Sequence, residues 1–74
     1  MILKEFLSGF CQPKGLLEQD VGIMDYIKDD IDPRQIFYDA GTELSEHSED
    51  PVMDAVVIYA WYEDGCLFIE VESK

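Results

Sequence analysis

The chain has 74 residues, of which 17 are Asp or Glu and 5 are Lys or Arg, so its formal net charge at pH 7 is −12. Because 47% of the residues are hydrophobic, the composition excludes a disordered acidic tail and favours a folded chain. The charge disfavours nucleic acid and anionic membrane as direct partners, since like charges repel. The length fits one small domain over residues 1–74.

The amino terminus and the cysteines bear on the compartment. Lys4 and Glu5 interrupt the first apolar residues, unlike a signal peptide, and no apolar run approaches the ~18 residues of a membrane span. Cys11 and Cys66 are too few for a disulfide scaffold. We therefore expect a reduced, cytoplasmic protein, located in the host cell if a virus or plasmid encodes it.

The first half of the chain predicts helices. Apolar residues recur at helical spacing over 2–10, and a second such pattern covers 21–31, with Asp20 as its N-cap. On that second helix Asp25 and Asp29 would lie one turn apart on the exposed face. Its end is expected near Asp32, before a proline.

Two further segments precede the last third. Residues 35–40 fit a third short helix after Pro33, and a strand is the alternative. Residues 42–51 carry three glutamates and one aspartate and predict an acidic loop.

The last third predicts a β-hairpin, with strands at about 53–62 and 66–73. Asp64-Gly65 is a type I′ turn dipeptide, and both flanking runs are rich in β-branched and aromatic residues. A two-residue turn pairs Tyr62 with Leu67, Ala60 with Ile69, Ile58 with Val71, Trp61 with Phe68, Tyr59 with Glu70 and Val57 with Glu72. The predicted fold class is α+β, with two to three short helices packed on a small antiparallel sheet.

Two surfaces are candidate partner sites. One is the second face of the hairpin, where Tyr59, Trp61 and Phe68 lie near Glu70 and Glu72, because exposed aromatics are favoured interface anchors. The alternative is that this face is a second small core. The other surface is the run of aspartates at Asp20, Asp25, Asp29 and Asp32.

The spacing of the acids suggests mimicry of a nucleic acid. Asp25 and Asp29 would be about 6 Å apart on a helix, and Glu70 and Glu72 about 6.7 Å apart on one strand face. Phosphates along a nucleic-acid strand have similar spacing. Carboxylates so placed could occupy the phosphate sites of a DNA-binding protein and speed association.

The segment from Lys14 to Ile23 resembles part of the uracil-DNA glycosylase inhibitors, a family of acidic DNA mimics. It is similar to their short strand leading into an acidic Gln-Glu-Ser-Ile motif, although Val21-Gly22 replaces the serine. The resemblance implies that Asp20 contacts the enzyme's DNA-binding loop. It also implies that Met24, Ile27 and the sheet line a pocket for an enzyme side chain. Small phage anti-CRISPR proteins share this size and acidity.

The sequence thus predicts a protein inhibitor that binds the basic nucleic-acid-binding site of a DNA-processing or DNA-targeting enzyme, as in phage or plasmid counter-defence. The alternatives are an immunity or antitoxin-like protein and an acidic adaptor, each binding a basic protein through the hairpin face, or a homodimer through the Trp61 face. We expect neither an enzyme nor a cofactor or metal site, because no nucleophile with a base and no ligand spacing is present.

Overall fold

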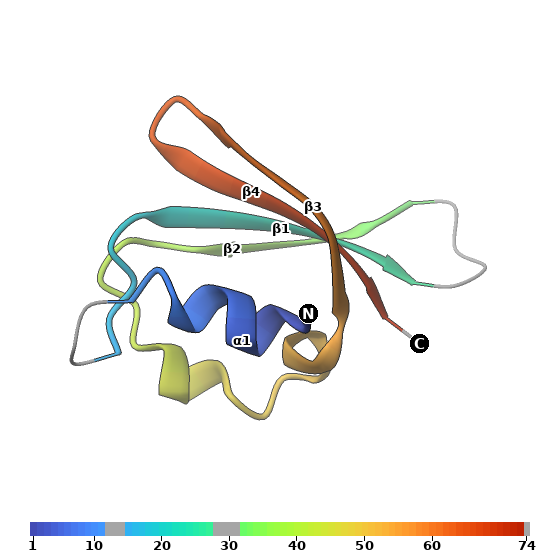
Figure 1. The fold of residues 1–74 in the computed structure, drawn as a ribbon, viewed down its shortest axis with the longest axis horizontal. Helices are drawn as coiled ribbons and strands as arrows, with labels where there is room; N and C mark the ends of the chain where they lie inside the picture. The colour runs from blue at the N-terminus through green and yellow to red at the C-terminus, as the bar shows by residue number, and fades with distance from the viewer. Residues whose placement is uncertain (12–14, 28–31, 74) are drawn as a thin grey trace.

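The computed structural model describes residues 1–11, 15–27 and 32–73, which form a sheet with helical segments on one side (Figure 1). The elements in chain order are α1 (Leu3–Ser8), β1 (Asp20–Ile27), β2 (Arg34–Tyr38), the 3₁₀ helices η1 (Leu44–His47) and η2 (Pro51–Asp54), β3 (Val56–Glu63) and β4 (Cys66–Ser73). The α+β class and the carboxyl-terminal hairpin are confirmed. Within the described ranges α1 is the one α-helix, fewer than predicted. No described helix has the length and apolar character needed to cross a membrane.

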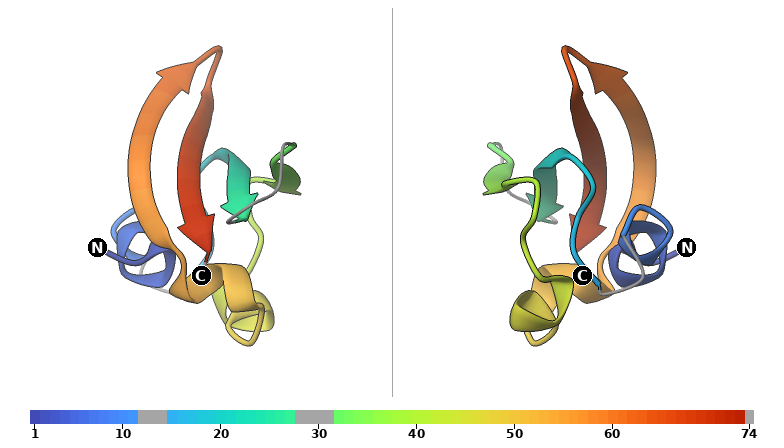
Figure 2. Two further views of the ribbon diagram at one scale, coloured as in Figure 1. Left: turned by 90° about the vertical axis from the view of Figure 1, so that its right-hand side faces the viewer. Right: turned by 90° about the vertical axis from the view of Figure 1, so that its left-hand side faces the viewer.

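The sheet has four strands in the order β2-β1-β4-β3. β1 runs antiparallel to β2 but parallel to β4, and β3 and β4 are antiparallel. The prediction of an antiparallel sheet was therefore wrong for the central pair. The chain between β2 and β3 passes through η1 and η2 on the helical side, which returns it for the final hairpin (Figure 2).

β1 replaces the helix predicted over 21–31. Val21, Ile23 and Asp25 are buried, whereas the residues between them lie on the other face of the sheet. This period of two overrides the apparent helical stripe because β-branched residues and Gly22 are weak helix formers. Asp20 caps no helix; its carboxylate accepts a hydrogen bond from the Ala40 N–H at 2.8 Å.

The helix predicted over 35–40 was wrong as well, and its alternative, a strand, is confirmed as β2. The segment predicted as an acidic loop contains η1 and the start of η2. Asp50 caps η2, where its side chain accepts a hydrogen bond from the Val52 N–H at 3.0 Å.

The hairpin turn adopts the predicted geometry, since Asp64 and Gly65 both have positive φ, 51° and 79°. The cross-strand pairs from Tyr59 to Tyr62 are confirmed. The pairs beyond them were wrong, because a bulge between Val57 and Tyr59 sets Val57 opposite Val71. The bulge directs the Val57 N–H to the Met1 carbonyl at 2.9 Å and leaves Ile58 exposed.

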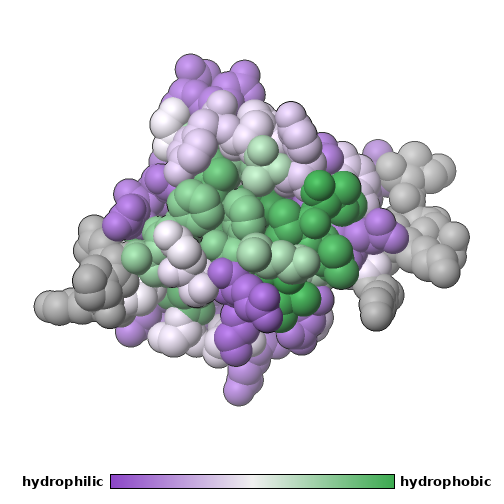
Figure 3. Space-filling model, in the orientation of Figure 1, coloured by the Kyte–Doolittle hydropathy of each residue, from purple (hydrophilic) through white to green (hydrophobic). Residues whose placement is uncertain are grey.

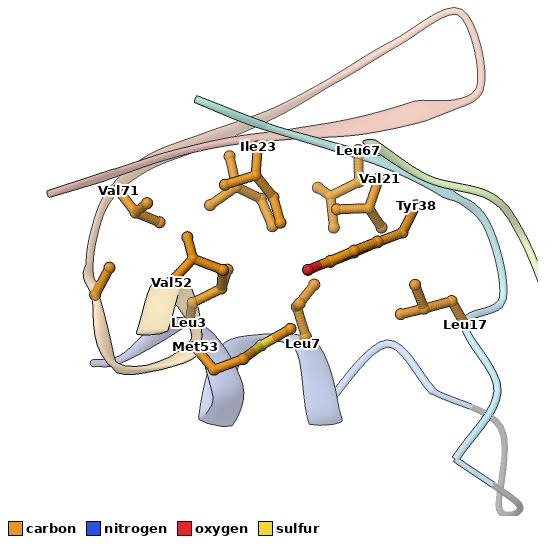
Figure 4. Packing of buried hydrophobic residues seen from close by; sticks show 12 residues of the cluster. Leu3, Leu7, Leu17, Val21, Ile23, Tyr38, Val52, Met53, Leu67 and Val71 are labelled. Atoms are coloured by element: carbon orange, nitrogen blue, oxygen red, sulfur yellow. The ribbon is translucent and has the colours of Figure 1, made fainter. Parts of the chain in front are cut away.

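The core lies between the sheet and the helical segments, where side chains from both layers meet (Figure 4). The sheet supplies Val21, Ile23, Tyr38, Leu67, Ile69 and Val71, and the other side supplies Leu3, Leu7, Leu17, Val52, Met53 and Ala55. The opposite sheet face contributes no residue to this cluster.

Tyr38 carries a polar hydroxyl into the core. Its hydroxyl is buried without a hydrogen-bond partner in the described part of the chain, and its ring stacks on His47 at 4.5 Å between centroids. Burial first, and then the Asp50 carboxylate against an opposing effect of Arg34, raises the pKa of Tyr38 above its ordinary value.

Tyr38→Phe should raise the free energy of unfolding by about 1 kcal/mol, because it removes an unpaired buried hydroxyl and keeps the ring. Urea unfolding at neutral pH measures this. Since the pKa of Tyr38 is raised in the folded state, the free energy of unfolding of the parent protein also falls as the pH rises past the ordinary tyrosine pKa of about 10. The free energy of unfolding of Tyr38→Phe should fall less over the same alkaline range. A variant less stable than the parent at neutral pH would mean that the hydroxyl is paired.

Candidate functional site

The sheet face turned away from α1, here called the open face, has no helical segment of the described ranges packed on it (Figure 1). Strand register and alternation place its residues. β1 and β2 supply Asp20, Gly22, Met24, Tyr26, Gln35 and Phe37, and the hairpin supplies Val56, Tyr59, Trp61, Glu63, Cys66, Phe68, Glu70 and Glu72.

An aromatic row crosses the open face from one edge strand to the other. Gly22 is paired with Phe37 on one side and with Phe68 on the other, and Phe68 is paired with Trp61. The Phe68 and Trp61 rings stack, with centroids 5.4 Å apart and planes at 21°. Tyr59 lies 5.6 Å from Trp61, centroid to centroid. Three of the predicted site residues thus form one aromatic cluster.

Gly22 makes room for this cluster. A Cβ atom there would lie 2.9 Å from Cδ1 of Phe68, closer than a real contact allows, so the ring lies over the glycine backbone. Beside the ring, a shallow hollow of about 430 Å³ is lined by Gly22, Ile23, Met24, Gln35, Ile36, Phe37 and Phe68. A side chain at position 22 would therefore displace Phe68 from its place on the open face.

Carboxylates adjoin the aromatic row. Glu70 is paired with Tyr59 and with Met24, and Glu72 follows on the same strand and face. The two ion pairs within the described residues both involve Arg34, so no described lysine or arginine neutralises Glu70 or Glu72. Predicted site residues Tyr59, Trp61, Phe68, Glu70 and Glu72 therefore share one face.

The predicted aspartate surface is not assembled in this way. Asp32 is exposed ahead of β2, and Asp20 is half-buried with its carboxylate held by the Ala40 N–H. Asp29 lies outside the described residues. The structure thus gives no helix on which Asp25 and Asp29 could pair.

Asp25 was placed wrongly on an exposed surface. Its relative exposure is 2%, because the pleat of β1 turns it toward the core. The Ser73 hydroxyl donates a hydrogen bond to Asp25 Oδ1 at 2.6 Å, and Arg34 Nη2 lies 3.9 Å from Oδ2. Arg34 also pairs with Asp50 at 3.3 Å. Asp25 therefore links β1 to β4 and β2 and has no place in a partner surface.

Sequence reasoning did not place Gly22, Met24, Gln35 and Phe37, which β1 and β2 supply, on one face with the hairpin. Of these residues it named only Met24, as part of the pocket that the resemblance implies. With both segments assigned to helices, these residues fall on different sides of two predicted helices and do not form one surface. The signal that could have found them is the alternation of the β-branched residues Val21 and Ile23 with Gly22, a residue that disfavours a helix interior.

A separate apolar area lies over β3 and α1 (Figure 3). Exposed apolar side chains there are Met1, which precedes α1, and Ile58 of β3. The amino-terminal residues pair with the start of β3 at this place, through the Ile2–Val56 bridge. They thereby cover part of an otherwise free sheet edge, which is a common protection against strand pairing with other chains.

The pKa of the Cys66 thiol depends on the charges at the open face. Burial first, then the nearby Asp20 carboxylate, raises the pKa of its thiol, against a smaller opposing effect of a backbone hydrogen bond from Gly22.

In a Cys11→Ser background, Cys66 should be alkylated more slowly at pH 8 than a free cysteine, because less thiolate is present. Negatively charged iodoacetate should react more slowly still than neutral iodoacetamide, and added salt should narrow that difference. Rates followed by mass spectrometry measure both effects. Equal rates with the two reagents at low salt would contradict an acidic surrounding.

Comparison of the chain with models of protein families, with curated proteins and with solved structures gave no match. The open face and the charge of the chain are therefore the observations that bear on function.

Proposed function

We propose that this protein is an inhibitor that binds the basic nucleic-acid-binding surface of a DNA-processing or DNA-targeting enzyme. The observation that carries the proposal is the open face, where an uncovered aromatic row adjoins Glu70 and Glu72 on a chain of net charge −12. The proposed contact residues are Tyr59, Trp61, Phe68, Glu70 and Glu72, with Asp20 and Asp32 near the ends of the neighbouring strands.

Charge and aromatic contact have different parts in this proposal. A net charge of −12 exceeds the magnitude of about 2–8 that keeps a small domain soluble, and such an excess costs stability by self-repulsion. A strongly acidic surface speeds encounter with a basic partner. The aromatic row would then provide the short-range contacts that slow dissociation.

An immunity or antitoxin-like protein, or an adaptor, remains the alternative, and one observation favours it. The centre of the open face is an apolar row rather than a regular array of carboxylates. Such a centre would serve recognition of any basic protein with a complementary apolar contact.

Elution with DNA separates these two functions. The immobilised protein is exposed to host lysate, and bound proteins are released with a double-stranded oligonucleotide at constant ionic strength. If the protein occupies a DNA-binding surface, the oligonucleotide should release an enzyme that processes DNA. Retention of the captured protein until high salt is applied would instead support the immunity or adaptor alternative.

The association rate with the captured partner should fall steeply as salt is raised, while the dissociation rate changes less. Charges at the rim of an interface act mainly on encounter and are screened over about 8 Å at physiological salt. Surface plasmon resonance at several salt concentrations measures both rates. An association rate independent of salt would contradict the role given to the charge.

A further inference from the structure

We propose that Tyr59, Trp61 and Glu70 form a binding site for an arginine side chain of the partner. The inference rests on the proposed function only in taking the partner to be a basic protein. Beyond that function, it identifies the partner side chain that one part of the open face would bind.

The three side chains come together through the register of the hairpin. Tyr59 is directly opposite Glu70, and Trp61 follows Tyr59 by two residues on the same face. The two rings are 5.6 Å apart and inclined at 34°. Tyr59 is 58% exposed, so an incoming side chain can reach its ring from solvent. An incoming group would thus meet the exposed Tyr59 ring, with the Glu70 carboxylate and the half-buried Trp61 ring, itself stacked on Phe68, beside it.

The charges around this position favour a cation. Glu70 has a second carboxylate, Glu72, on the same strand face, and no lysine or arginine of the described chain lies within ion-pair distance of either. A cation over Trp or Tyr is attracted by the electrons of the ring. The same cation would also relieve repulsion between the two glutamates.

Arginine fits this arrangement better than lysine. The planar guanidinium group stacks on aromatic rings and forms two parallel hydrogen bonds to one carboxylate, whereas an ammonium group is a compact and strongly hydrated charge. The cross-strand pair of Tyr59 and Glu70 provides both an aromatic ring and a carboxylate.

A second copy of this chain cannot provide the arginine in its present structure. Arg34 is the one arginine of the sequence, and it already pairs with Asp25 and Asp50. Two copies with net charges of −12 would also repel each other. The occupant is therefore a different protein, with an arginine on a basic surface.

Trp61 fluorescence gives a direct test, because it is the one tryptophan of the chain. The probes are two capped peptides of equal charge, Gly-Arg-Gly-Arg-Gly and Gly-Lys-Gly-Lys-Gly. The arginine peptide should change Trp61 emission and bind about threefold more tightly than the lysine peptide. Equal affinities, or no change in emission, would overturn the proposal.

Glu70→Gln and Glu46→Gln form a matched pair, since each removes one negative charge and Glu46 lies in η1, on the other side of the sheet. Glu70→Gln should weaken the arginine peptide about threefold and reduce its preference over lysine, while Glu46→Gln should change little. Circular dichroism checks that both variants are folded. Equal weakening by both would overturn the site in favour of diffuse attraction. The peptides contain no enzyme, so failure of the oligonucleotide elution would leave this result standing.

Discussion

Replacing Asp25 by alanine should lower the free energy of unfolding by about 2–4 kcal/mol, as measured by urea denaturation. The change removes the short hydrogen bond from Ser73 and the ion pair with Arg34, which join β1 to the end of β4 and to β2. The loss should stay within this range because Arg34 is half exposed and keeps its contact with Asp50. For so small a domain it is a large part of the total stability.

Two controls separate this contact from a general effect of charge. Asp54→Ala removes one exposed carboxylate from η2 and should change stability by less than about 0.5 kcal/mol. Asp25→Val combined with Ser73→Ala should recover much of the loss, because a buried polar pair can be replaced by apolar groups of similar size. If Asp25→Ala is no more harmful than Asp54→Ala, Asp25 is solvated and the assignment to the core is wrong.

Trp61→Ala should weaken binding to the captured partner by at least about 2 kcal/mol, or roughly 30-fold in the dissociation constant. Trp61 lies at the centre of the aromatic cluster, between Phe68 and Tyr59. The free energy of unfolding should fall by less, because the described helical segments leave this face uncovered. Isothermal titration calorimetry and urea denaturation of the same variant measure the two effects.

Tyr62→Ala is the matched control, since Tyr62 adjoins Trp61 on β3 but points to the opposite side of the strand and is exposed. It should leave partner binding within about twofold of the parent. An unfolding penalty of about 3–5 kcal/mol for Trp61→Ala, together with normal binding, would show that the open face is a small core rather than an interface.

The hairpin could be predicted from sequence because its signals are local. Asp64-Gly65 fixes the turn type and the register, so the pairs near the turn follow from counting. The bulge could not be predicted, since it accompanies a backbone hydrogen bond between Val57 and Met1, which is distant in sequence. The turn dipeptide therefore predicts the strand pairs from Tyr62 to Tyr59 correctly, and the pairs beyond the bulge incorrectly.

β1 was missed, and β2 was given only as the alternative to a helix, for a related physical reason. Both are flanked by residues that also cap helices, and β1 is a strand because it lies between β2 and β4. The burial of Asp25 is equally invisible in the sequence, where Asp25 falls on the polar face of the predicted helix over 21–31. The candidate site was accordingly half predicted, from the strands whose register the turn dictates.

The place of β4 in the sheet has a consequence for how the chain reaches its native state. β4 is the last strand in the described chain, yet it lies between β1 and β3 and carries Leu67, Ile69 and Val71 into the core. Until it is synthesised, β1 lacks one neighbour and the apolar side chains of α1 have no complete layer to cover. Pairing β1 with β4 closes a long loop, a step that slows folding. During translation the nascent protein therefore cannot complete its sheet and core until β4 has left the ribosome, and its acidity would help to keep it soluble until then.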